Sequence, residues 1–244
     1  MIKRILFTFL GTGLLLTSAF TQEAASKVAL GEYKYTMKMS GGAQEMELDI
    51  QRTVKEEDGK IIIIDNTSTP YGSNENISTI DAESLMTISQ SSTGFMTSNI
   101  DYTAEKITGE TADFRGNKTP IDLDVEGTVY GGGSAIEPVL ANMTLEIGHQ
   151  EKMKTFVVFQ MQVTEMDVEV AAKETLEVPG GTFEAYRLDF SIPDFADFTQ
   201  STWVSANEPR MVLKSVVNAP QMGQMTTVYA GKKGEKKKKK KKKQ

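Results

Sequence analysis

Apolar and polar residues alternate along most of this chain, a pattern typical of strands with one buried face and one solvated face. Between Tyr33 and Met39, aromatic and methionine side chains fall on one face, while charged and polar side chains fall on the other. The turn residues Ser40-Gly41-Gly42 follow, and the segment Met46–Val54 then repeats the alternation. These two segments therefore predict an N-terminal hairpin of amphipathic strands.

A second hairpin is predicted between Glu174 and Phe190. Two runs of strand-type residues flank Pro179-Gly180-Gly181, where proline fixes φ and glycine accepts a positive φ. Trp203–Ser205 and Met211–Val217 repeat the plan of strand, turn and strand directly downstream. The C-terminal third of the chain is therefore predicted to consist of consecutive antiparallel strands.

One helix is expected, over Ser134–Asn142, because Ser134 and Glu137 have the spacing of a capping box and Pro138 falls in the first turn. The rest of the chain has short strand-type runs bounded by turn residues, giving about a dozen strands. We predict an all-β fold, a large curved antiparallel meander sheet or incomplete barrel with one short helix. A two-sheet β-sandwich is the alternative.

The first 21 residues have the features of a secretory signal peptide. Lys3 and Arg4 form a positive start, and Ile5–Leu16 is an apolar run too short to span a bilayer well. Cleavage is expected before Gln22, with cleavage after Ala25 and an uncleaved anchor as alternatives. We expect one all-β domain over residues 22–230 and a disordered lysine-rich tail over residues 231–244.

The charge of the chain is divided unevenly. The stretch 231–244 holds ten lysines against one glutamate, a net charge of +9, which leaves −15 on residues 1–230 out of −6 for the whole chain. The run Lys236–Lys243 could dock to an anionic envelope surface, at about 1 kcal/mol per lysine, or it could be a solvated tail without a partner. No nucleic acid is expected, because no aromatic residue interleaves the lysines.

Candidate chemistry is sparse. The chain has no cysteine, which excludes disulfides and the lipid-modified cysteine of a lipoprotein. His149 is the single histidine, so a hydrolase would depend on it, and it lies in an apparent turn. Rows of acidic residues such as Asp122, Asp124 and Glu126 match strand alternation and indicate a solvated face better than a calcium site. No cofactor and no metal site are predicted.

Five aromatic residues are the candidates for lining an apolar ligand site, although a plain hydrophobic core is the favoured explanation, because aromatic residues dominate the cores of proteins of every function. They are Tyr33, Tyr35, Tyr186, Phe190 and Trp203.

The run V-P-G-G-T-F-E-A-Y-R-L at Val178–Leu188, with T-W-V-S at Thr202–Ser205 and R-M-V-L-K-S at Arg210–Ser215, resembles a bacterial envelope family of unknown function, domain of unknown function 3108. Ser134–Gly148 resembles the helix segment of the same family. The resemblance implies an exported all-β protein with a large curved sheet, similar to the half-barrel of lipoprotein carriers, and implies no catalytic residues. The absent cysteine and the lysine tail depart from the family pattern.

Together these features favour a non-enzymatic protein of the periplasm or cell envelope that is not a lipoprotein. Its concave sheet face is expected to bind a lipid-like or apolar ligand. The first alternative is a scaffold or interaction protein that docks to polyanions through its tail. The second is a hydrolase that uses His149.

Overall fold

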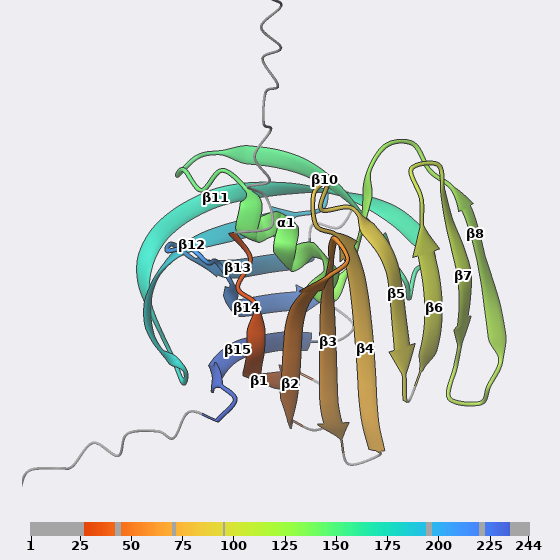
Figure 1. Ribbon diagram of the computed structural model, residues 1–244, viewed down its shortest axis with the longest axis horizontal. Coiled ribbons are helices and arrows are strands. Elements are labelled where there is room, and N and C mark those ends of the chain that lie inside the picture. Colours follow the sequence, from red (N-terminus) through yellow and green to blue (C-terminus); the bar gives the residue numbers. More distant parts are fainter. Residues whose placement is uncertain are drawn as a thin grey trace, which may run out of the picture.

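The computed structural model describes residues 27–41, 45–69, 72–94, 96–193, 197–219 and 223–234. The expected leader and the run Lys236–Lys243 lie outside the described residues. Within the described part, fifteen strands form one sheet, accompanied by one short α-helix (Figure 1). The elements are β1 (Gly31–Ser40), β2 (Met46–Glu57), β3 (Lys60–Thr69), β4 (Gly72–Asp81), β5 (Thr87–Thr93), β6 (Thr97–Tyr102), β7 (Lys106–Ala112), β8 (Lys118–Asp124), β9 (Val129–Gly131), η2 (Gly133–Ile136), α1 (Glu137–Asn142), β10 (Gln150–Val157), β11 (Gln162–Val178), β12 (Gly181–Ser191), β13 (Thr199–Ser205), β14 (Val212–Ala219) and β15 (Gly223–Lys232).

Two meanders are joined edge to edge. The strand order is β8-β7-β6-β5-β4-β3-β2-β1-β15-β14-β13-β12-β11-β10-β9, so the first and last strands pair in the middle of the sheet. Neighbours are antiparallel except β9 and β10, which are parallel. The predicted curved antiparallel meander with one short helix is confirmed, and the described strands form a single sheet rather than the two sheets of a sandwich.

Side chains alternate across the sheet as the sequence predicted. In β1, Tyr33 and Tyr35 are buried while Glu32 and Lys34 are exposed. The buried face of β2 includes one charged residue. Arg52 lies on this face between Ile50 and Val54 and is as buried as they are.

The sheet is strongly curved, and its ends fold back onto other strands. Register shifts in four strand pairs, including the one between Val170 and Ala172, sharpen the local twist. The long β11–β12 hairpin curls round until its turn reaches β15 (Figure 1), where the Gly180 N–H donates to the Tyr229 carbonyl at 3.1 Å. The rings of Phe183 and Tyr229 meet edge to face at 5.8 Å.

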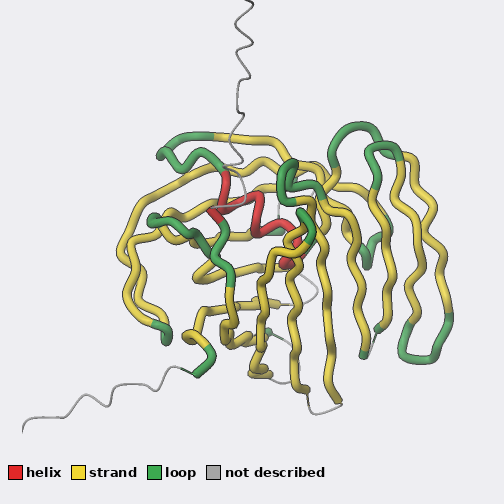
Figure 2. Tube along the Cα trace, viewed as in Figure 1, coloured by secondary structure: helices red, strands yellow, loops and turns green. Residues whose placement is uncertain are grey.

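The helix α1 lies inside the curve of the sheet, with β11 and β12 passing round one side and β2 to β4 on the other (Figure 2). Leu140 packs in the cluster formed by β11 to β14, and Ala141 packs in the cluster centred on β1 to β4. A third cluster forms where the β10–β11 turn packs on β6 to β8. The concave face is therefore covered by a segment of the same chain.

The predicted helix is present, but its beginning differs from the capping box. The segment opens with the 3₁₀ turn η2, and Ile136 is the N-cap residue of α1. Neither element has a side-chain hydrogen bond at its N-cap, and Ser134 instead accepts the Glu137 N–H at its backbone carbonyl. Glu137 is engaged elsewhere, because its carboxylate reaches across to Arg52 on β2. Pro138 lies in the first turn of α1, as expected.

We expect Gly180→Ala to destabilise the fold, because a Cβ at this position would lie 2.4 Å from two ring carbons of the buried Tyr229. Overpacking of this kind costs about 1–3 kcal/mol in the free energy of unfolding, which urea denaturation would measure. Gly132→Ala is the matched control, since the nearest atom to its Cβ is 3.7 Å away. Equal stability of the two variants would show that the hairpin turn does not pack tightly on β15.

Candidate functional site

Two of the five predicted lining residues lie together on the concave face. The rings of Tyr33 and Tyr35 each contact the ring of Tyr229 edge to face, at centroid distances of 6.1 and 5.7 Å. The Tyr33 hydroxyl donates to the Leu30 carbonyl at 2.7 Å, and the Tyr35 hydroxyl donates to the Val212 carbonyl at 2.9 Å. Burial raises the pKa of both phenols. Both side chains are thus integrated into the core around the helix.

Of the other three residues, Trp203 belongs to the same core cluster as Tyr33 and Tyr35, whereas Phe190 and Tyr186 lie in the neighbouring cluster. Phe190 is buried in the cluster of β11 to β14, and Tyr186 packs at its edge with the Lys173 ammonium 5.4 Å from its ring centroid. Trp203 is buried, and its indole N–H donates to Glu174. The Lys214 ammonium lies 4.5 Å from the Trp203 ring centroid.

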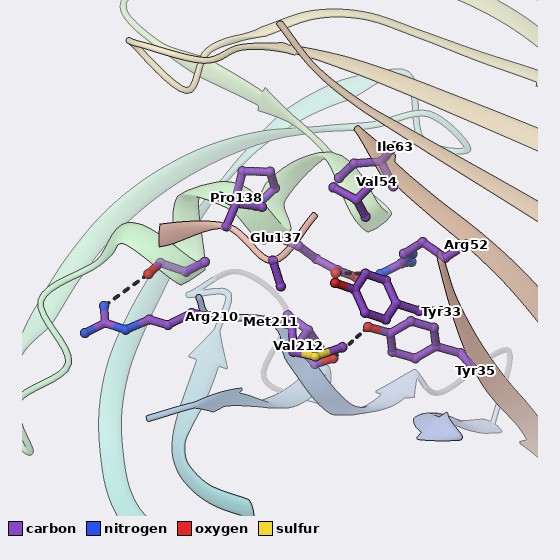
Figure 3. Close-up of a pocket in the computed structure, with 13 residues that line it drawn as sticks. Tyr33, Tyr35, Arg52, Val54, Ile63, Glu137, Pro138, Arg210, Met211 and Val212 are labelled. Atoms are coloured by element: carbon purple, nitrogen blue, oxygen red, sulfur yellow. Dashed lines mark hydrogen bonds and ion pairs between the residues drawn. The ribbon is translucent and has the colours of Figure 1, made fainter. Parts of the chain in front are cut away.

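A small cavity lies between α1 and the first two strands, and Figure 3 shows its lining. Its volume is about 20 Å³, which is room for about one water molecule. The lining includes Tyr33, Tyr35, Arg52, Glu137, Pro138 and Arg210. Among the described residues, the space beside α1 therefore leaves no room for a larger molecule.

A buried charge cluster contributes Arg52 and Glu137 to the lining of this cavity. Arg52 on β2 makes a bidentate ion pair with Asp65 on β3, in which Nε lies 2.6 Å from Oδ1 and Nη2 lies 2.8 Å from Oδ2. Its Nη1 donates to Glu137 Oε2 on α1 at 2.5 Å (Figure 3). The guanidinium also lies 4.6 Å from the ring centroid of Tyr35. The side chains of Arg52, Asp65 and Glu137 are 7%, 11% and 22% exposed.

The cluster contains one cation and two carboxylates. Burial raises the pKa of Glu137, although Arg52 acts in the opposite direction. Burial by itself would lower the pKa of Arg52, but Glu137 and Asp65 together raise it well above its ordinary value. Arg52 therefore stays protonated, and burial makes ionisation of Glu137 costly.

A second arginine ties down the other end of α1. Arg210 Nη1 donates to the carbonyls of Ala141 and Met143 at 3.1 and 3.3 Å. Its backbone pairs with the residues that precede β1, since its N–H donates to the Lys27 carbonyl and its carbonyl accepts from the Ala29 N–H. Its Nε is buried and has no hydrogen-bond partner. The helix is thus held at one end by Glu137 on Arg52 and at the other by Arg210.

Sequence reasoning missed this cluster, although two signals were present. A charged residue between Ile50 and Val54 breaks the apolar face of a strand. Asp65 continues the buried positions Ile61 and Ile63 at a spacing of two residues. Burying a charge is costly unless an opposite charge lies nearby. A buried arginine on one strand and a buried aspartate on the next strand therefore indicate an ion pair between them.

The outer face has a larger and shallower feature. An open hollow of about 670 Å³ runs across β10, β11 and β12, with Glu151, Lys152, Asp167, Glu169 and Asp189 among its lining residues. Lys152 bridges Glu165 at 3.0 Å and Asp167 at 3.1 Å. One acidic row lies on β11 on this side, where Glu165 and Glu169 are exposed and Asp167 is half-buried.

His149 lies beside Glu151, with 2.8 Å between Nε2 and Oε1. Within the described part of the chain no serine hydroxyl is hydrogen-bonded to it. Among the same residues, no group of three or more His, Asp or Glu side chains is placed to hold a metal ion. None of the described helices has the length and apolar character needed to cross a bilayer.

We expect Arg52→Met to lower the free energy of unfolding by about 3–5 kcal/mol, because it leaves two buried carboxylates without their cation. Lys152→Met is the matched control, since Lys152 also bridges two carboxylates but its side chain is 67% exposed. Its loss should cost far less, because ion pairs between exposed side chains contribute little to stability. Urea denaturation of both variants checks the difference, and similar costs would contradict a structural role for the buried cluster.

Solved structures of other proteins resemble this chain in fold. No curated protein matches the chain. A β-barrel-like protein of the DUF1849 family from Brucella abortus is 7% identical, with 84% of this chain and 98% of that chain covered and a TM-score of 0.54. A protein from Bacteroides fragilis, described as a possible exported protein with a YmcC-like fold, is 11% identical over 85% and 98% of the two chains, with a TM-score of 0.35. At this identity the first likeness bears on the fold alone.

The sequence match is more specific than these structural likenesses. The DUF3108 family, described as proteins of unknown function, matches residues 33–236. The match includes both meanders, the helix α1 and all members of the buried charge cluster. It confirms the resemblance carried by the Val178–Leu188 hairpin. The chain therefore belongs to the DUF3108 family.

Proposed function

We propose that this protein is an exported, non-enzymatic component of the bacterial cell envelope that binds a lipid-like or apolar ligand on the concave face of its sheet. The observation that carries the proposal is the way this face is covered. The curved sheet packs part of its apolar side on itself, and η2 and α1, together only ten residues from Gly133 to Asn142, cover much of the remainder in place of a second sheet. Displacing so small a cover would expose a continuous apolar surface.

Ligand binding must be coupled to movement of α1, because the cavity beside it is only about 20 Å³. A ligand pocket for a drug-sized molecule has a volume of about 300–1,000 Å³. Burial of an acyl chain contributes roughly 25 cal/mol per Å² of apolar surface, which can offset the contacts that α1 gives up. The export signal in residues 1–21 and the acidic outer face suit a carrier that stays soluble outside the cytoplasm.

The filled interior also favours a second candidate, a scaffold that binds through its surface. In that case the core never opens, and the run Lys236–Lys243 docks to anionic lipid head groups or other envelope polyanions. The two candidates differ in what they bind: an apolar molecule inside the sheet, or a charged surface outside it.

We expect the protein to carry an acyl lipid when it is isolated from its compartment. The full chain, expressed with its own leader in a bacterium with two membranes, would be purified from the periplasm for native mass spectrometry with lipid extraction. The expected result is a mature chain that begins at Gln22 with about one lipid bound per chain. A ligand-free mass that also takes up no added fatty acid or phospholipid would exclude the carrier function.

The scaffold candidate predicts a different dependence. Binding to vesicles of an anionic phospholipid should then be lost at high salt and on truncation after Gly234, because the lysines supply the attraction. Vesicles of a zwitterionic phospholipid are the control. Binding that survives the truncation would remove the tail from the mechanism.

A further inference from the structure

Glu137 is a surplus anion in the buried cluster. Asp65 already balances the charge of Arg52 and occupies its Nε and Nη2 through two hydrogen bonds. Glu137 is a second carboxylate on the same guanidinium, through Nη1 alone. If Glu137 left, Arg52 would keep a buried partner, so the large cost of an unpaired buried charge would not arise. Burial also raises the pKa of Glu137, which means that its ionised form is disfavoured here relative to water.

The residues behind Glu137 are apolar. Pro138 and Ala141 line the same cavity, and Leu140 is fully buried in the neighbouring cluster beside Leu188 and Val204. This segment therefore places one carboxylate on a guanidinium and a short apolar stretch against the sheet. A molecule with an anionic head and an apolar chain presents the same two features in the same order.

The helix α1 also has little stability of its own. The helix α1 has six residues, and its N-cap residue Ile136 makes no side-chain cap. A helix of this length is not stable alone in water. Its position depends on packing, on the Glu137–Arg52 contact and on the bonds from Arg210 to two carbonyls. A ligand that replaced these contacts would meet little resistance from the helix itself.

We propose that α1 occupies the site of an anionic amphiphile, and that Glu137 stands in for the carboxylate or phosphate head group of that ligand on Arg52. This inference rests on the proposed function and names its ligand class. When α1 withdraws, the head group accepts from Arg52 Nη1, and the apolar chain lies against the residues that α1 now covers. Exchanging one anion for another leaves the charge of the cluster unchanged for a singly charged head group.

Arg210 fits the same assignment. Its side chain lines the cavity, and withdrawal of α1 frees its Nη1 from the carbonyls of Ala141 and Met143. Its Nε is buried without a partner in the closed arrangement. The contact with Glu208 involves a different nitrogen, since Arg210 Nη2 lies 3.7 Å from Glu208 Oε1. Two arginines thus face the place where α1 lies, which favours an anionic ligand over a neutral one.

The test compares head groups on an identical chain. Dissociation constants would be measured by native mass spectrometry and by displacement of a fluorescent fatty acid, for a long-chain fatty acid, the fatty alcohol of equal length and the monoalkyl phosphate of equal length. Wild-type protein should bind the acid about ten-fold more tightly than the alcohol, in keeping with a hydrogen bond to a charged group. Whichever of the two acids binds more tightly identifies the head group as carboxylate or phosphate.

Glu137→Ala is the decisive variant, because it removes the competing anion and loosens α1 while leaving the pair of Arg52 and Asp65 intact. It should bind the fatty acid about ten-fold more tightly than the wild type does, with a smaller gain for the alcohol. Glu165→Ala is the matched control, since it removes a carboxylate that pairs with Lys152 on the outer face. It should bind as the wild type does. Arg52→Met, where it folds, should abolish the preference for the acid.

The outcomes separate this inference from the proposed function. Equal binding of acid and alcohol by the wild type and by Glu137→Ala would overturn the head-group assignment while leaving an apolar ligand on the concave face. Failure of every probe to bind either protein would overturn both. A gain in Glu165→Ala equal to that in Glu137→Ala would overturn the role of Glu137, because a general loss of negative charge would then explain it.

Discussion

A single sheet with one apolar face must bury that face without a second layer, and this constraint shapes the whole molecule. The pairing of β1 with β15 joins two meanders into one sheet. The apolar side of this sheet is too wide to be shielded from water if the sheet stays flat. The sheet curls, the β11–β12 hairpin reaches β15, and the β10–β11 turn packs on β6 to β8. What remains open is covered by α1, which therefore contacts both large clusters.

The cover is attached by charge as well as by packing. A buried ion pair is seldom a gain in stability over well-packed apolar residues, because desolvation offsets much of the attraction. Its directional hydrogen bonds, however, fix one arrangement of Arg52, Asp65 and Glu137 and so define where α1 lies. This attachment needs both partners, so it is lost when Glu137 leaves. The hydrogen bond from Arg52 that fixes the position of α1 can then be accepted by another anion in place of Glu137.

Local patterns account for most of the fold. The alternation in β1 and β2, the turn at Pro179-Gly180-Gly181 and the strands around Trp203 all follow from side-chain period and turn chemistry, which act over a few residues. The site was less accessible. Tyr33 and Tyr35 were found because aromatic residues mark interiors, whereas Glu137 was assigned to a helix cap because its partner lies 85 residues away in the sequence.

The sequence by itself determined the strands, their faces, the place of the single helix and the family, because these depend on short-range periodicity and on contiguous motifs. Only the tertiary structure decided that the first and last strands pair, that the concave face is filled, and that Arg52, Asp65 and Glu137 meet. The physical reason is the same for all three. Each depends on the curvature of the whole sheet, which sums the small twists of many strand pairs and is recorded in no single segment of the chain.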